Sequence, residues 1–260
     1  MGTAAIQGEL WGAKARDWAE AQEPAWLPVF GAAMALAGVG QGRRLLDIGC
    51  GTGGALVIAR DRGAEVSGID ASEAFVAIAR ERLPDAQIEA GEMEELPFAD
   101  GAFDIVTGIN SFQFAGDMIR ALGEAARVCD SGGSVFMLVW GQRDRCQLQL
   151  AAIRALGPLL PPSPVPPLPL AEPGVIEGLL RMAGLTPIGS GVLDETIAFP
   201  DSGTALRAFA SAGMVTRAER HSGAHKVRDA LADAIRPYIR GDGQVMLANQ
   251  FRWVKAVPEF

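Results

Sequence analysis

Short apolar runs alternate with amphipathic stretches between about residues 44 and 140. The apolar runs are rich in branched residues, which predicts buried strands, whereas the intervening stretches carry apolar residues at helical spacing. The expected strands are 44–48, 65–69, 87–90, 102–109 and 132–139, and the expected helices are 54–61, 72–82 and 117–128. Strands and helices that alternate in this way form a parallel sheet with helices on both faces. We therefore expect a doubly wound α/β fold.

The flanking segments follow other patterns. Residues 11–36 predict helix, interrupted near Pro24 and Pro28. Eight of the sixteen prolines lie between Pro158 and Pro173, which predicts an extended connection. The remaining expected elements are a helix over 172–183, a strand over 193–199, mostly helix over 202–240, and a strand or strand pair over 244–257. A helical insertion before the last strand is typical of a cap over a substrate cleft.

Charge and cysteine content bear on the partners and the compartment. The formal net charge is −8 and there is no run of Lys and Arg, so we expect no nucleic-acid partner. The three cysteines are scattered without metal or disulfide spacing, which fits a reducing compartment. The first residues lack the pattern of a signal peptide, and no apolar run has the length of a membrane span. These features predict a cytoplasmic protein with no membrane span.

A glycine-rich turn follows the first expected strand, in the segment LLDIGCGTGG at 45–54. Glycine lets a backbone approach a ligand closely, and a strand that leads through such a turn into a helix builds the nucleotide site of α/β proteins. The spacing Gly49-x-Gly51-x-x-Gly54 satisfies the dinucleotide fingerprint. An NAD-dependent oxidoreductase is therefore one possible function.

Two acids help to separate the possible ligands. Asp47 precedes the turn, where a carboxylate would repel a pyrophosphate but attract the ammonium of a bound methionine group. Asp70 ends the second expected strand, where its carboxylate can accept hydrogen bonds from both hydroxyls of a ribose. Asp47 therefore favours a nucleoside that carries an amino acid over a dinucleotide, whereas Asp70 fits the ribose of either ligand.

This pattern resembles the Asp/Glu-x-Gly-x-Gly-x-Gly loop of class I S-adenosylmethionine (SAM) methyltransferases. A second segment, GEMEELPF at 91–98 followed by FDIV at 103–106, is similar to the G-D-A-E-x-L-P-F…F-D-x-V segment of that family. The resemblance covers roughly residues 40–140, and its nearest group is the small-molecule branch that includes enzymes like those of ubiquinone and menaquinone biosynthesis. It implies a Rossmann-like sheet of seven mostly parallel strands, with SAM as methyl donor and S-adenosylhomocysteine as product.

The resemblance also implies which residues bind the cofactor. They are Asp47, Gly49, Gly51, Gly53, Asp70, Ala71, Glu92, Met93, Asn110 and Trp11. Glu92 would bond the adenine amino group, and the backbone N–H of Met93 would meet a ring nitrogen. Asn110 would lie near the methionine part. Trp11 would close over the cofactor and give an aromatic face to its sulfonium; alternatively, the N-terminal tryptophans form a helix buried against the core.

The expected organisation has five parts. They are an N-terminal helical lid over 1–40, a SAM-binding core over 41–140, a proline-rich connection with a helix and a strand over 141–200, a helical cap insertion over 201–243, and the final strand or strands over 244–258. A lid and a cap would exclude water from the reacting groups.

The predicted function is a SAM-dependent methyltransferase that acts on a small molecule. Methyl transfer is an in-line displacement, so the enzyme mainly holds three atoms collinear, and no residue identifies itself as a general base. His221 and His225 have i, i+4 spacing but lack a third ligand, so we expect no metal site. A third possibility, besides the oxidoreductase, is a non-catalytic SAM-binding regulatory protein.

Overall fold

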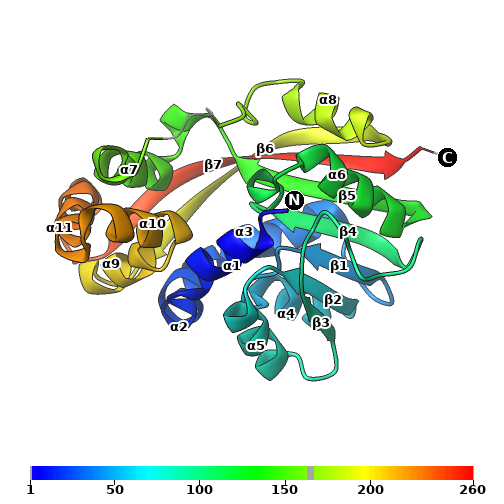
Figure 1. Cartoon of the computed structure of the whole chain (residues 1–260), viewed down its shortest axis with the longest axis horizontal. Helices are drawn as coiled ribbons and strands as arrows, with labels where there is room; N and C mark the ends of the chain where they lie inside the picture. The colour runs from blue at the N-terminus through cyan, green and yellow to red at the C-terminus, as the bar shows by residue number, and fades with distance from the viewer. Residues whose placement is uncertain (1, 163–166, 260) are drawn as a thin grey trace.

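The computed structural model describes residues 2–162 and 167–259 and is built around a seven-stranded sheet (Figure 1). The strand order is β3-β2-β1-β4-β5-β7-β6. The strands are β1 (Arg44–Ile48), β2 (Glu65–Asp70), β3 (Gln87–Ala90), β4 (Phe103–Ile109), β5 (Cys129–Trp140), β6 (Leu185–Phe199) and β7 (Val245–Pro258). All neighbours are parallel except β7, which is antiparallel to β5 and β6. The predicted mostly parallel α/β fold is confirmed.

Helices cover both faces of this sheet. One apolar core joins α3 (Glu23–Ala37), α4 (Gly54–Asp61) and α5 (Glu73–Arg82) to one face, and a second joins α6 (Met118–Val128) and α8 (Val175–Met182) to the other. Leu45 of β1 belongs to the first core and the next residue, Leu46, to the second, because successive strand side chains point to opposite faces. A strand buried on both sides reads as a continuous apolar run, as it does here.

The N-terminal segment is helical from Ala4 to Ala37, in four pieces, apart from a turn at residues 13–14. They are α1 (Ala4–Gly12), α2 (Ala15–Asp17), a π-helical segment (Trp18–Gln22) and α3. Pro24 lies in the first turn of α3, where a missing N–H costs nothing. The predicted interruption near Pro28 is wrong, because α3 continues through it. The fully buried Val29 and Ala33 hold that helix against the sheet on the far side of the proline.

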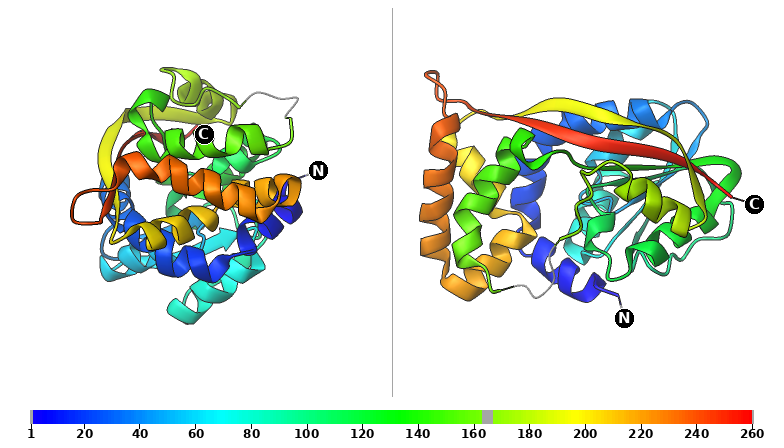
Figure 2. Two further views of the ribbon diagram at one scale, coloured as in Figure 1. Left: turned by 90° about the vertical axis from the view of Figure 1, so that its left-hand side faces the viewer. Right: turned by 90° about the horizontal axis from the view of Figure 1, so that it is seen from above.

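A group of helices stands beyond the carboxyl ends of the parallel strands. The chain passes from β6 into α9 (Ser202–Ala210), α10 (Gly213–Ser222) and α11 (Ala224–Ile235) before it returns as β7. An additional helix, α7 (Gln147–Leu156), packs against α11 and was not anticipated from the sequence. The long β6–β7 pair connects this group to the core (Figure 2). None of the helices in the described part of the chain is long and apolar enough to cross a membrane.

One expectation about the second half of the chain changes. β6 begins at Leu185, well before the expected 193. Of the two alternatives for residues 244–257, the single strand is confirmed, as β7. Pairing along nearly the whole of β7 explains the length of β6, whose first half has many exposed residues and therefore no strong apolar signal. The proline-rich connection lies between α7 and α8, and its residues 163–166 are outside the described ranges.

Candidate cofactor site

The glycine loop connects β1 to α4 in a conformation that glycine permits. Gly49, Gly51 and Gly53 all have positive φ, at 78°, 57° and 87°. The N–H groups of Gly49 and Cys50 both donate to the carbonyl of Ile69, at 2.8 and 3.0 Å. A Cβ on Gly49 would stand 2.3 Å from the Cβ of Ser111. The loop is therefore held between the end of β2 and the segment that follows β4.

Asp70 ties this loop to the start of α5. Its Oδ2 accepts the N–H of Gly51 at 2.9 Å, and its Oδ1 accepts the N–H of Ser72 at 2.8 Å. Burial raises the pKa of Asp70 to about 6, although these two hydrogen bonds act in the opposite direction. Each carboxylate oxygen has a second lone pair, so Asp70 can still accept from a ligand.

Asp47 lies deeper, between β1 and β4. Its side chain is only 2% exposed, and its Oδ1 accepts the hydroxyl of Thr107 at 2.6 Å. Its pKa is raised to about 7, chiefly by burial and to a smaller extent by the nearby charge of Asp70, against the lowering effect of the Thr107 bond. A positive charge placed near this buried acid would stabilise its ionised form and lower its pKa.

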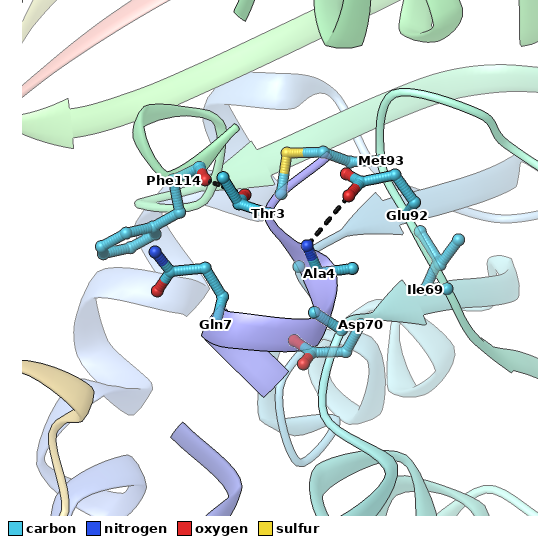
Figure 3. Close-up of a pocket in the computed structure, with 11 residues that line it drawn as sticks. Thr3, Ala4, Gln7, Ile69, Asp70, Glu92, Met93 and Phe114 are labelled. Atoms are coloured by element: carbon cyan, nitrogen blue, oxygen red, sulfur yellow. Dashed lines mark hydrogen bonds between the residues drawn. The ribbon is translucent and has the colours of Figure 1, made fainter. Parts of the chain in front are cut away.

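A small cavity of about 30 Å³, partly open to solvent, lies against the glycine loop (Figure 3). It is lined by Thr3, Ala4, Gln7, Gly49, Ile69, Asp70, Ala71, Gly91, Glu92, Met93 and Phe114. Five of the residues that the sequence indicated for cofactor binding are in this lining: Gly49, Asp70, Ala71, Glu92 and Met93. They meet there because the carboxyl ends of the adjacent parallel strands β1, β2 and β3 share one edge of the sheet.

The first turn of α1 enters this cavity. The N–H of Ala4 donates to Oε2 of Glu92 at 2.9 Å, and the hydroxyl of Thr3 donates to the carbonyl of Phe114 at 2.5 Å (Figure 3). Gly8 packs so closely on the backbone of Ala71 that a Cβ there would approach its carbonyl oxygen to 2.1 Å. The N-terminal helix therefore contacts two walls of the cavity.

Trp11 lies outside the cavity lining and packs α1 against neighbouring aromatic residues and α10. Its ring meets Phe114 and Trp18 edge to face, with centroids 5.4 and 5.3 Å apart. On its other side it packs on Gly213 of α10, where a Cβ would come within 3.0 Å of the indole. The role of Trp11 toward a sulfonium stays a prediction.

The segment after β4 carries an unusual set of polar side chains. Asn110 has φ of 52°, the only non-glycine residue with positive φ in the described ranges. Three buried side-chain atoms have no hydrogen-bond partner there: Nδ2 of Asn110, Oγ of Ser111 and Oε1 of Gln113. Unpaired buried polar atoms cost about 1–3 kcal/mol each, so this segment is suited to a ligand that supplies their partners. The sequence indicated Asn110 but not Ser111, whose contact with Gly49 depends on the fold.

The two histidines do not form a pair on one helix. Gly223, with φ of 89°, ends α10 after His221, whereas His225 lies in α11. His225 is exposed and its Nδ1 lies 3.0 Å from Oδ2 of Asp229. The i, i+4 spacing in the sequence therefore spans a helix boundary.

The comparisons with known proteins add to this geometry. A family model described as a methyltransferase domain matches residues 46–137, which run from β1 into β5 and contain the glycine loop, Asp70 and Glu92. This part of the chain is a class I SAM-dependent methyltransferase domain. The sheet order with its antiparallel β7 agrees with this family.

Two relatives of this chain are methyltransferases by name. A malonyl-[acyl-carrier protein] O-methyltransferase of Erwinia pyrifoliae is 32% identical over 174 residues, which cover 67% of this chain and 63% of that protein. A demethylmenaquinone methyltransferase of Thermus thermophilus is 39% identical over 102 residues, 37% of this chain and 46% of that protein. The chain spans about half the length of the curated relatives it matches.

A solved structure shares the fold across most of this chain. It is the [4+2]-cyclase SpnF, with a TM-score of 0.58, 22% identity, and coverage of 90% of this chain and 81% of that one. Since a protein described as a cyclase has the same fold, the architecture alone does not specify the reaction.

Proposed function

We propose that this protein transfers a methyl group from SAM to a small-molecule acceptor by in-line displacement. The observation that carries the proposal is the meeting of Gly49, Asp70 and Glu92 around one cavity inside the matched family segment. Asp70 would accept the ribose hydroxyls and Glu92 the adenine amino group. SAM itself would supply the activated methyl group, and the residues of the chain would bind and orient it.

The rest of the chain would enclose the acceptor. Residues 1–40 would act as a lid, since α1 already contacts the cavity, and the helices of 201–243 would form a cap beyond the carboxyl ends of the strands. Asn110, Ser111 and Gln113 would bind the methionine part of SAM or the acceptor through their unpaired atoms. The names of the two methyltransferase relatives give different acceptors, so the acceptors to be tested include both kinds.

The test is methyl transfer from isotopically labelled SAM into a broad panel of carrier-bound acids, quinones, phenols, amines and thiols. Labelled product and S-adenosylhomocysteine should appear together in equal amounts. Tight binding of SAM without turnover across the panel would favour the regulatory protein, and tight binding of NADH without SAM binding would favour the oxidoreductase.

A pH dependence follows from the two buried acids. The pKa values of Asp47 and Asp70, about 7 and about 6, exceed the ordinary 3.8. The folded protein therefore holds these protons more tightly than the unfolded chain does. Their contribution to stability is complete below pH 3.8 and is lost as the pH rises through about 6 and 7. The cationic groups of SAM favour the ionised acids, so binding should release protons.

We expect SAM affinity to rise by about tenfold as the pH rises from about 5.5 to about 7.5. Calorimetry in two buffers of different ionisation enthalpy measures the proton release directly. The Asp47→Asn variant keeps an acceptor for Thr107 but cannot titrate, so its pH dependence should be flatter. An equally steep dependence in this variant would show that Asp47 does not sense the cofactor.

A further inference from the structure

Glu23 is a buried acid that the sequence analysis did not single out. It is the first residue of α3 and is 4% exposed. Its Oε2 accepts the N–H of Gly54 at 3.0 Å and the hydroxyl of Thr52, and its Oε1 pairs with Arg82 of α5. Arg82 also donates to the carbonyl of Thr52 at 2.9 Å. A carboxylate from the N-terminal segment thus reaches the junction between the glycine loop and α4.

This contact explains why residue 54 is glycine. A Cβ at position 54 would stand 2.6 Å from Cδ of Glu23, so any side chain there would displace the carboxylate. In dinucleotide-binding proteins the helix start after the glycine-rich turn receives a pyrophosphate. Here the spacing Gly49-x-Gly51-x-x-Gly54 matches that fingerprint, but a side chain of the same molecule uses the first free N–H of α4.

The local charge is balanced without any ligand. One carboxylate faces one guanidinium, and the hydroxyl of Thr52 and the N–H of Gly54 already have an acceptor. A phosphate brought to this position would find the positive charge of Arg82 already neutralised by Glu23, so nothing there would compensate the phosphate for its lost hydration. It would also find the nearest donors occupied.

We propose that Glu23 is a specificity-determining residue that makes the glycine loop reject nucleotides bearing phosphate. The site then takes a nucleoside whose 5′ substituent carries no phosphate. The inference rests on the proposed function, because it concerns the same loop that would bind SAM.

The experiment compares adenosine with ADP as competitors of S-adenosylhomocysteine, measured by calorimetry on the full chain. The wild-type protein should bind adenosine at least about tenfold more tightly than ADP. The quantity compared is the ratio of the Kd for ADP to the Kd for adenosine. In Glu23→Gln, which keeps the shape of the side chain and removes its charge, this ratio should fall by about fivefold or more. Glu23→Ala should shift it in the same direction.

Glu73→Gln is the matched control. Glu73 is an exposed acid in the first turn of the neighbouring helix α5, and the same substitution there should leave the ratio unchanged. A purely structural role for Glu23 would weaken both competitors equally and leave the ratio constant, which would overturn the proposal. Equal binding of adenosine and ADP by the wild-type protein would also overturn it, whether or not the variants fold. Failure of the wild-type protein to bind S-adenosylhomocysteine would instead reject the proposed function.

Discussion

Replacing Asp70 by alanine should lower SAM affinity by at least about 100-fold, or about 3 kcal/mol. The carboxylate would lose its ribose contacts, and the loop would lose the two backbone bonds from Gly51 and Ser72 that fix its position. The effect therefore combines a direct contact with the loss of a preformed site. Calorimetry with SAM and S-adenosylhomocysteine measures it, and thermal unfolding reports whether the variant is intact.

Asp70→Asn separates these two effects. Its amide oxygen can still accept one of the two backbone N–H groups, so the loop should be better preserved, but a neutral amide makes weaker bonds to the ribose hydroxyls. We expect an affinity between those of the wild-type protein and Asp70→Ala. A folded Asp70→Ala variant with wild-type affinity would reject the assignment of Asp70 to the ribose.

Gly49→Ala should destabilise the protein by about 2–4 kcal/mol, whereas Gly51→Ala should cost about 1 kcal/mol. Both residues have positive φ, so both variants strain the backbone. Only at Gly49 does the new Cβ meet another side chain, 2.3 Å from the Cβ of Ser111; at Gly51 the nearest atom is 3.9 Å away. Denaturant unfolding measures the difference between the two variants.

The double variant Gly49→Ala/Ser111→Gly tests the cause. The double variant removes the steric contact but keeps a positive φ at residue 49. It should therefore lose about as much stability as Gly51→Ala does, and less than Gly49→Ala alone. SAM affinity should follow the same order, because the loop would be displaced from the cavity in Gly49→Ala alone. Equal losses in the two single variants would show that Ser111 does not constrain the loop.

The central part of the fold could be predicted because its signals are local. β1, β4 and the second half of β5 are apolar runs, and parallel strands necessarily bring their carboxyl ends to one edge. That rule alone places Asp70 and Glu92 in one cavity, although 22 positions separate them in the sequence. The same reasoning fails for β6, whose exposed first half follows from its place at the sheet edge.

The contacts of the N-terminal segment could not be predicted, because they join residues far apart in the chain. Ala4 meets Glu92, and Glu23 meets Gly54, through tertiary packing that leaves no periodic trace in the sequence. The contact between Gly49 and Ser111 is of the same kind. Pro28 shows the opposite case, where a strong local signal for a helix end is overridden by burial of the residues that follow it.

The position of the first turn of α1 has a kinetic consequence. The N–H of Ala4 gives Glu92 the same kind of donor that an adenine amino group would offer, so in the proposed role of Glu92 the first turn of α1 would compete with the cofactor. Entry of SAM would then require the turn to withdraw first. The observed rate of binding should level off at high SAM concentration, at a plateau set by the opening of the helix rather than by diffusion.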